Sequence, residues 1–484
     1  VTISDTSDNL ARNFDALRKV ANNITQVTQS DPDTALQVSA PQWAQLGTLL
    51  SKFSTNYQLQ VSDVPAAKAA TAASSSHVAS FTVLDSSANI AAQLANLQGQ
   101  TKLQSIATST PTTNITVPAG QLTTQAEALG KLTGNYGLAV TQATAEQAVG
   151  YASNLHIKSV AVLDSAAGVS AQLDGLKTLG LRLKEIRGSD TQVFAVTADQ
   201  LQTDALVIGK IYKGYQLSVL GASMDQVQSL TSNRKVVSVD IEDTAANLAN
   251  NLALLDRLGS DLHSIHITDT ANPLTLSSDD FGAHAAQLQK ILATDDYTLS
   301  ITNASVDEAQ TLLDNARVGS ITVADSSAAI ASRLDALQLN TKVTDIRQTG
   351  KPTALAVNWG QITADADTLA KIRGNYNLQV SGVDAAHALS VAQGNARITS
   401  LSVSDSGSAI TANLDSLAAL GKRLSRIDQS DNTSALNLSV SQWSNNMGTL
   451  SKIAITVGRI IMESGRPSVS GLGSGSSSMK RTMS

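Results

Sequence analysis

Apolar residues along the chain alternate between two periods in a fixed order. The stretch Phe81–Leu84 alternates apolar and polar positions, which predicts a β-strand. The next apolar residues are Ile90, Leu94 and Leu97, whose spacing of four and three places them on one face of a helix. Three further strands, with helices after the last two, are predicted at Leu103–Ile106, Ile115–Val117 and Tyr136–Val140.

This order of elements recurs with a period of about 80 residues, which is typical of a repeat architecture. An aspartate followed by Ser or Thr closes the first strand, and successive aspartates are 80, 79, 79, 82 and 80 residues apart. A lysine follows each aspartate by 46 or 47 residues, and a Tyr-x-Leu-x-Val/Ile phrase follows the lysine in five repeats. The three columns are Asp5, Asp85, Asp164, Asp243, Asp325 and Asp405; Lys52, Lys131, Lys210, Lys290, Lys371 and Lys452; and Tyr57, Tyr136, Tyr215, Tyr297 and Tyr376.

The positions of the three columns define where each repeat begins and ends, and where the repeats stop. After Ile453 the Tyr-x-Leu-x-Val strand is missing, and the last 21 residues are rich in Gly and Ser, so we expect a flexible tail there. The chain starts at Val1, and neither end shows a polar capping element, which suggests a processed or partial chain, or ends covered by neighbouring subunits. The predicted parts are repeats 1–80, 81–159, 160–238, 239–320, 321–400 and a partial repeat 401–463, followed by the tail 464–484.

Each repeat is interpreted as β-α-β-β-α-β-α, with about 23 residues between strands joined by a helix. Short crossovers of constant length indicate parallel strands with right-handed connections. The sequence therefore predicts an α/β repeat solenoid of stacked strand–helix coils, with three coils per repeat. The alternative is a string of independent βαββαβ beads of ferredoxin-like type, in which the short β-β step is a hairpin.

The amino-acid composition argues against several classes of function. The 484 residues carry 34 Lys+Arg and 40 Asp+Glu, and this net charge of −6 argues against a nucleic-acid partner. Aromatic residues are only 3%, too few for extensive stacking platforms. Cysteine is absent, which excludes disulfides and thiolate metal sites and is compatible with export. No stretch of about 20 apolar residues occurs, so we expect no membrane span.

The aspartate column has two interpretations. Six carboxylates at strand ends could bind calcium, but calcium needs six to eight oxygens and each repeat offers one aspartate here. Asp, Ser and Thr are also the preferred residues for capping a helix N-terminus. We expect capping, and calcium remains the alternative for a chain that otherwise needs no cofactor.

The lysine and tyrosine columns are candidate binding faces. The lysines fall in the last turn of a helix, where a cation complements the helix dipole. A second basic column precedes the first strand, and together the two could form a stripe that grips an anionic polymer. The tyrosines could line a glycan-binding groove, or pack their rings and leave their hydroxyls in water. The second basic column is His77, His156, Lys235, Arg317 and Arg397.

Catalysis finds little support in the sequence. His263 and His266 lie three residues apart without a third ligand at metal spacing. No nucleophile elbow, phosphate-binding loop, dinucleotide fingerprint or zinc-protease motif occurs. No long insertion breaks the repeat to make room for a unique active site. We therefore expect a protein that is not an enzyme.

The run Val83-Leu84-Asp85-Ser86-Ser87-Ala88-Asn89-Ile90-Ala91-Ala92-Gln93-Leu94 and the similar run that starts at Asp243 carry a resemblance. They resemble the Ala/Ser/Thr/Asp-rich repeat arrays of large secreted or surface, adhesin-like proteins of Gram-negative bacteria. The resemblance implies an extracellular or cell-surface location and a role as stalk, adhesin or matrix component. It implies no catalytic residue.

Three function hypotheses follow. The leading one is an extracellular structural repeat protein that acts as a rigid stalk or self-assembles into a surface or matrix fibre. The second is an adhesin-type binding module that holds an extracellular polysaccharide or a host or cell-surface protein along one solenoid face. The third is an array whose folding depends on calcium.

Overall fold

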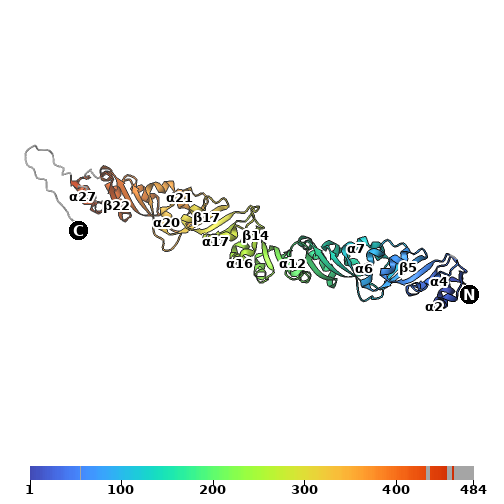
Figure 1. The fold of residues 1–484 in the computed structure, drawn as a ribbon. Helices are drawn as coiled ribbons and strands as arrows, with labels where there is room; N and C mark the ends of the chain where they lie inside the picture. Colours follow the sequence, from blue (N-terminus) through green and yellow to red (C-terminus); the bar gives the residue numbers. More distant parts are fainter. Residues whose placement is uncertain (55, 432–435, 455–459, 463–484) are drawn as a thin grey trace, which may run out of the picture. The chain divides into compact units, whose positions relative to one another are not determined.

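The protein is an α/β repeat protein in which strands and helices alternate throughout. The computed structural model describes residues 1–54, 56–431, 436–454 and 460–462. Its strands form five four-stranded sheets and two two-stranded sheets within these residues, and the paired strands run parallel (Figure 1).

The strands, taken sheet by sheet, are short. The sheets consist of β1 (Thr2–Asp5) and β2 (Gln26–Gln29); β3 (Leu36–Ser39), β4 (Leu59–Val64), β5 (Val78–Asp85) and β6 (Leu103–Thr108); β7 (Ile115–Pro118), β8 (Leu138–Ala143), β9 (Ile157–Asp164) and β10 (Leu183–Gly188); β11 (Val193–Thr197), β12 (Gln216–Ala222), β13 (Val236–Asp243) and β14 (Leu262–Ile267); β15 (Leu274–Ser277), β16 (Leu299–Ala304), β17 (Val318–Asp325) and β18 (Val343–Gln348); β19 (Leu355–Asn358), β20 (Leu378–Val383), β21 (Ile398–Asp405) and β22 (Leu424–Gln429); and β23 (Leu436–Leu438) and β24 (Ile460–Met462).

The helices have four to seven residues, except α6 with eleven. They are α1 (Ser7–Arg12), α2 (Phe14–Lys19), α3 (Ala40–Trp43), α4 (Gly47–Leu50), α5 (Ala69–Ser74), α6 (Ser87–Leu97), α7 (Ala119–Thr124), α8 (Ala126–Gly130), α9 (Ala145–Gly150), α10 (Ala166–Ala171), α11 (Leu173–Leu176), α12 (Ala198–Thr203), α13 (Ala205–Ile208), α14 (Val227–Thr231), α15 (Ala245–Asn250), α16 (Leu252–Leu258), α17 (Ser278–Ala283), α18 (Ala285–Leu288), α19 (Val306–Thr311), α20 (Ser327–Ser332), α21 (Leu334–Leu339), α22 (Trp359–Ala364), α23 (Ala366–Lys371), α24 (Ala388–Gly394), α25 (Gly407–Ala412), α26 (Leu414–Ala419), α27 (Val440–Asn445) and α28 (Met447–Leu450).

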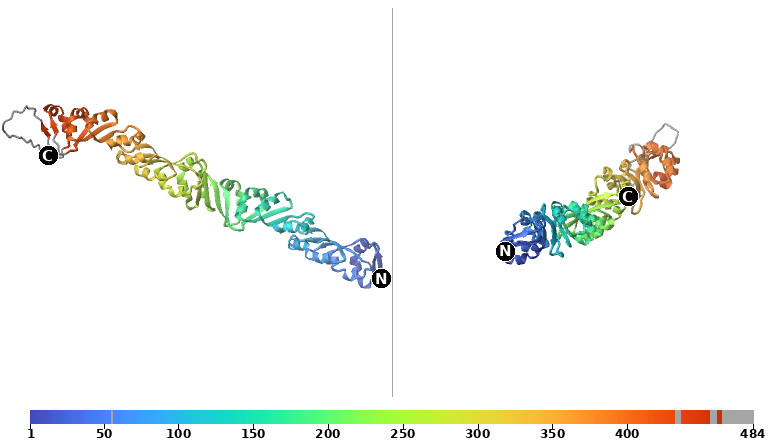
Figure 2. Two further views of the ribbon diagram at one scale, coloured as in Figure 1. Left: turned by 90° about the horizontal axis from the view of Figure 1, so that it is seen from above. Right: turned by 90° about the vertical axis from the view of Figure 1, so that its right-hand side faces the viewer.

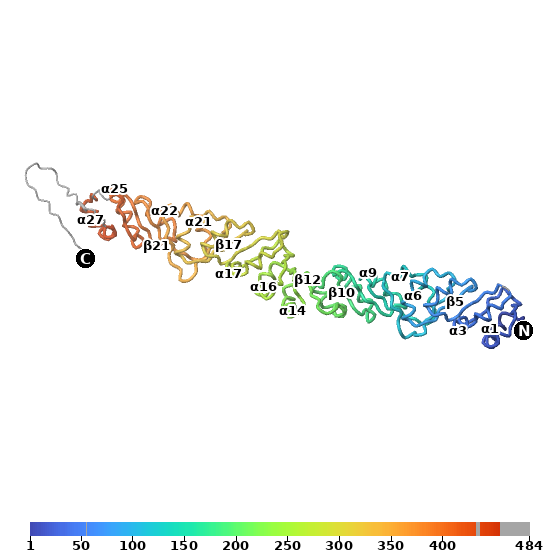
Figure 3. Tube along the Cα trace, in the orientation of Figure 1, coloured from blue at the N-terminus to red at the C-terminus, as the bar shows by residue number. Residues whose placement is uncertain are grey.

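Each four-stranded sheet takes its strands in chain order, as in β3-β4-β5-β6, with helical crossovers between neighbours. The Cα trace accordingly winds in successive turns within each part of the chain (Figure 3). This confirms the predicted solenoid of strand–helix coils. The ferredoxin-like beads are contradicted, because the short β-β step is not a hairpin: β6 and β7 belong to different sheets.

That short step is where one sheet passes to the next. Ile106, in β6, donates its backbone N–H to Lys131 and accepts one from Thr133. A few residues further along both segments, Ile115 at the start of β7 donates to Gly137, just before β8. The segment 131–138 therefore pairs first with one sheet and then with the following one. Equivalent bridges join Val27 to Phe53, Ile186 to Ile211, Ile346 to Ile372 and Ile427 to Ile453.

The core is aliphatic and lies between the strands and the helices that cross over them. Ile90, Leu94 and Leu97 are all buried, as their helical spacing predicts. The single helix predicted after the first strand of each repeat is unbroken only in the second repeat, where it is α6. In the other described repeats a residue at the ninth position of the run, such as Arg333 with φ −119° and ψ 17°, breaks it into two short helices. The apolar face continues across the break, since Ile330, Leu334 and Leu337 are buried.

A bulge with a left-handed residue recurs in the strand after each tyrosine. The strand register shifts between Val61 and Val64, and Asp63 between them has φ +57°. The equivalent residues are Gln142, Gly221, Asn303 and Gly382, all with positive φ. Gly, Asn and Asp tolerate this region, so four of the five residues of the column suit the backbone and Gln142 is the exception.

The chain divides into two compact units. One consists of Val1–Glu242 and Ala253–His266, and the other of Asp243–Leu252 and Ile267–Ser484. The same coil recurs within each unit, and the ribbon views of Figure 2 let the reader follow it from strand to strand. The sheets do not coincide with the predicted repeats: β3–β6 run from repeat 1–80 into repeat 81–159.

The last described residues correct one expectation. No strand is predicted after Ile453, but β24 pairs parallel with β23, with Ile460 opposite Leu436. It takes the place that β8 holds beside β7. The predicted tail 464–484 lies outside the described residues. Within those residues, no helix combines the length and the apolar character that crossing a bilayer requires.

A single repeat cut from the array, such as residues 81–159, should be much less stable than the whole chain. Its outer strands lose the neighbouring coils that complete their hydrogen bonds and cover their apolar residues. We expect no cooperative melting transition of the fragment by circular dichroism at temperatures where the full chain is folded. A fragment that melts as high as the full chain would show that the repeats fold independently.

Candidate functional site

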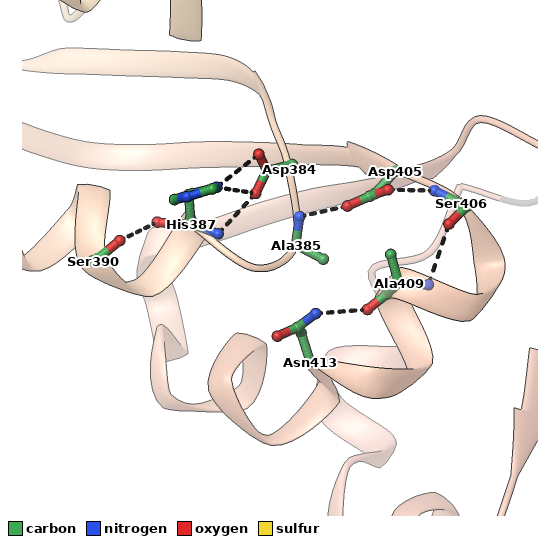
Figure 4. A network of polar contacts seen from close by, with 8 residues as sticks. All are labelled: Asp384, Ala385, His387, Ser390, Asp405, Ser406, Ala409 and Asn413. Carbon is green, nitrogen blue, oxygen red and sulfur yellow. Dashed lines mark hydrogen bonds and ion pairs between the residues drawn. The ribbon is translucent and has the colours of Figure 1, made fainter.

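The aspartate column connects successive coils. Figure 4 shows Asp405 between the starts of two helices. One carboxylate oxygen accepts the N–H of the next residue, Ser406, at 2.7 Å. The other accepts the N–H of Ala385, in the preceding coil, at 2.9 Å. The same link to the preceding coil joins Asp85 to Ala66 at 2.9 Å, Asp164 to Ala145 at 2.9 Å and Asp325 to Val306 at 3.1 Å.

The small residue after each aspartate caps the helix that begins there. Ser406 accepts the N–H of Ala409 through its side chain, and Ser86 accepts that of Asn89. Capping of this kind satisfies one of the backbone donors that a helix start leaves free. The sequence thus identified the cap, but not the bond from the aspartate to the preceding coil.

The carboxylates of this column are satisfied by protein donors. Burial raises the pKa of Asp85, but hydrogen bonds from Asn89, Ser86 and Ala66 outweigh it, and the net effect is a lowered pKa. Asn9 and the Thr6 N–H likewise lower the pKa of Asp5. Among the described residues, no three His, Asp or Glu side chains gather where they could hold a metal ion. The geometry favours capping, and calcium binding by the column stays an untested prediction.

A second acidic column was missed by sequence reasoning. Asp190, in the turn between β10 and β11, accepts the N–H of Ala166 at 2.9 Å. Ala166 begins α10 in the coil before, and this hydrogen bond lowers the pKa of Asp190. Because the residue lies in a polar turn, only its recurrence 24 residues after a helix start could have revealed it. The equivalent bonds are Asp31 to Ser7 at 2.6 Å, Asp269 to Ala245 at 2.6 Å and Asp431 to Gly407 at 2.7 Å.

The tyrosine column and the second basic column form one set of pairs. Leu59 donates its N–H to the carbonyl of His77, which places the His77 ring beside that of Tyr57. These rings stack with centroids 4.2 Å apart. The same contact recurs as Tyr136 with His156 at 4.2 Å, Lys235 over Tyr215 at 3.4 Å, Arg317 over Tyr297 at 4.8 Å and Arg397 over Tyr376 at 3.9 Å.

These pairs leave no open row of tyrosine rings. Tyr215 and Tyr376 are 8% exposed, and the other three are half-buried. Burial raises the pKa of Tyr376, and its hydroxyl donates to the carbonyl of Leu369 at 2.9 Å. A cation over a ring face stabilises both partners, so the contact joins one coil to the next.

Two members of the lysine column reach into the preceding coil. Lys131 donates through Nζ to the carbonyl of Gln100 at 2.8 Å, and Lys452 to that of Gly421 at 2.6 Å. Both carbonyls follow the end of a helix, where a cation complements the dipole. Lys290 is exposed, whereas the other five are half-buried. A further cation column, not noticed in the sequence, does the same through Lys102 to Ser75, Arg182 to Ala152, Lys342 to Asn315 and Arg423 to Ala392.

One group of side chains departs from the repeat. The His387 ring donates through Nδ1 to a carboxylate oxygen of Asp384 at 2.7 Å, as Figure 4 shows. Its face stacks on Trp359 at 5.4 Å. Trp359 is half-buried and begins α22, where other repeats have small residues or Val440. Asp384 also accepts the His387 N–H, so the pair replaces the capping box found at Thr144 and its equivalents.

His263 and His266, considered above as metal ligands, do not form a cluster with other ligands in the described residues. His263 instead contacts Asp240 through Nδ1 at 2.6 Å. Comparison of the chain with protein-family models, curated proteins and solved structures finds no match.

The substitution Asp405→Asn should destabilise the second unit by about 1–3 kcal/mol. An amide can accept only one of the two N–H bonds, so a partly buried backbone donor loses its partner. The readout is the urea midpoint followed by tryptophan fluorescence. The control is Asp307→Asn, whose carboxylate is 75% exposed in a surface ion pair and should change the midpoint little. Equal effects of the two substitutions would contradict the bridging role.

Replacing Arg397 by Met should cost about 0.5–2 kcal/mol, because the cation over Tyr376 is removed while the aliphatic stem is kept. Arg397→Lys should retain most of the stability, since Lys235 serves at the equivalent position. Thermal melting of the full chain compares the two variants. A loss in Arg397→Lys as large as in Arg397→Met would assign the effect to packing instead of charge.

Proposed function

We propose that this chain is a non-catalytic structural protein of a bacterial surface or extracellular matrix, in which each unit acts as a stiff spacer. One observation carries the proposal: most residues of the aspartate, tyrosine and second basic columns, and two of the column lysines, contact a neighbouring coil. Asp405 bonds to Ala385, Lys131 to Gln100, and Arg397 covers Tyr376.

In a repeat protein that binds a polymer, recurring side chains line an open face and contact the ligand. Here the recurring carboxylates accept backbone N–H groups, and the recurring cations reach carbonyls or aromatic rings. Their recurrence is explained by folding alone. Such contacts add resistance to bending between coils, which is the property a spacer needs.

The proposed location and partners draw on the resemblance to surface and secreted repeat arrays. Stalks and matrix fibres commonly work as assemblies, so a second copy of the chain is the partner that we propose. The adhesin-type alternative requires an exposed row of one column. It draws little support from tyrosines that are buried or half-buried, two of them 8% exposed.

The stiffness of one unit can be measured directly, because the chain has no cysteine that would interfere with labelling. Ala44, Thr123 and Gln202 are exposed and occupy equivalent positions in three repeats of the first unit. Spin labels at the three possible pairs of introduced cysteines, read by double electron–electron resonance, should give narrow distance distributions. The distribution for the outer pair should be about as narrow as for the inner pairs.

A distribution that broadens with separation as in a flexible chain would overturn the spacer role. Sedimentation and electron microscopy over a range of concentrations test assembly, and a strictly monomeric particle would remove that part. Calcium dependence is tested by melting the chain with and without a chelator, and an unchanged transition would eliminate the third hypothesis.

A further inference from the structure

A buried carboxyl group lies where two coils of the second unit meet. Asp365 stands between α22 and α23 and is 2% exposed, and its Oδ2 has no hydrogen-bond partner among the residues that the structure describes. The neighbouring acid is Asp335, an exposed residue on α21 in the preceding coil: the equivalent side chains of the sixth repeat, Asn446 and Asp415, are joined by a hydrogen bond of 2.9 Å. A buried carboxylate without a compensating charge is costly, so Asp365 needs either a cation or a proton.

The neighbouring side chains supply no cation. Gln361 donates through Nε2 to Oδ1 of Asp335 at 2.9 Å. Gln338, which also projects from α21, accepts the N–H of Thr368 at 3.0 Å and its hydroxyl at 2.7 Å. The charged groups on the packed elements are Arg333, which pairs with Asp307 at 3.1 Å, and Asp367 and Lys371 on α23. None of these three has an ion pair with Asp365 among the described residues.

The third repeat shows what a cation does at this place. Asp174 and Asp204 are the equivalent carboxylates there, and Asp204 is 1% exposed. Lys177 forms an ion pair with both, at 3.0 Å from Asp174. Its position corresponds to Gln338. The buried Asp204 and the exposed Asp174, whose side chain is 66% exposed, thus share one ammonium group in the third repeat, whereas Asp365 and Asp335 have none among the described residues of the fifth.

Other repeats avoid the second acid. In the sixth, Asn446 replaces Asp365 and donates through Nδ2 to Asp415 at 2.9 Å. In the first, the position is Leu46, which is fully buried. An amide, a leucine or a lysine-paired acid therefore all fit this junction. The fifth repeat is the one in which only a proton can supply the missing donor.

We propose that Asp335 and Asp365 share a proton and form an acid latch, which holds α21 to α22 and α23 when the pair is singly protonated and loosens that junction when the proton is lost. In the latched form, the Asp365 carboxyl group donates to the Asp335 carboxylate, as the Asn446 amide donates to Asp415. In the open form both carboxyl groups are charged, although Asp365 is only 2% exposed and has little contact with water. This device is independent of the spacer role.

The direction of the pH effect follows from the two groups. Burial raises the pKa of Asp365 from 3.8 to about 6, while the hydrogen bond from Gln361 lowers that of Asp335. An acid with a raised pKa stabilises the fold below its unfolded value, and that stability is lost as pH rises through about 6. Asp335 acts oppositely and protects the junction until pH falls below 3.8. The latch is therefore strongest near pH 4–5 and open above about pH 7.

Hydrogen exchange of the full chain, followed by mass spectrometry and corrected for the intrinsic pH dependence, tests the latch. Between pH 5 and pH 8, peptides covering 334–371 should lose protection by up to about 100-fold, because a pKa shift of about two units corresponds to that ratio. The equivalent peptides around Asp204 and Asn446 serve as internal controls and should change little. Equal protection of 334–371 at both pH values would overturn the proposal.

Three variants separate the proton from other causes. Asp365→Asn copies the sixth repeat, and Asp365→Leu copies the first in case the amide disturbs folding; both should keep the junction protected at pH 8. Gln338→Lys copies the third repeat and should have the same effect. If all three variants lose as much protection at pH 8 as the wild type does, the proposed latch is overturned. A second result would also overturn the latch: millimolar calcium chloride at pH 8 restores protection of the wild type and leaves Asp365→Asn unchanged. A metal ion would then take the place of the proton.

Discussion

The backbone hydrogen bonds between successive coils are the constraint on which the rest of this structure depends. Parallel strands cannot be joined by tight turns, so each strand is followed by a crossover before the chain returns beside it. The bridge from Ile106 to Lys131 and the next bond, from Ile115 to Gly137, carry this pairing from one sheet into the following one. Core packing, helix length and the position of every polar column follow from that stacking.

Short crossovers create a problem that the charged residues solve. In a helix of six residues the unpaired backbone groups at the two ends outnumber the paired ones. Near the starts of helices, free N–H groups donate to carboxylates such as those of Asp405 and Asp190. After the ends of helices, free carbonyl groups accept hydrogen bonds from Lys131 and Lys452. In each case the side chain comes from the following coil. The charges therefore stabilise the stacking itself and the helices at the same time, and this is why they recur with the period of the fold.

Positions that depart from the period carry different information. Trp359, His387 and Asp384 replace a standard capping box. Asp365 is a buried acid at a position where the third repeat pairs its acid with Lys177 and the sixth repeat has Asn446. Repetition makes such departures visible, because the chain contains its own reference structures. In a spacer built from near-identical coils, a single coil with a titratable junction would be a local weak point whose strength follows pH.

The sequence alone determined the local architecture. Apolar spacing at Ile90, Leu94 and Leu97 specified a helical face, and alternation at Phe81–Leu84 specified a strand, because these patterns depend on the geometry of one element. The constant crossover length also specified parallel strands. The repeat period and the capping serine or threonine could be read in the same way, since the cap and its helix are adjacent in the chain.

Only the tertiary structure decided which columns meet. Tyr376 and Arg397 were each noticed as separate columns, and nothing in their spacing showed that one covers the other. The second bond of Asp405, the role of Asp190 and the Asp335–Asp365 pair all join residues of different coils. Such contacts depend on the register between coils, and register is fixed by strand pairing across some 20 to 30 residues instead of by any local pattern.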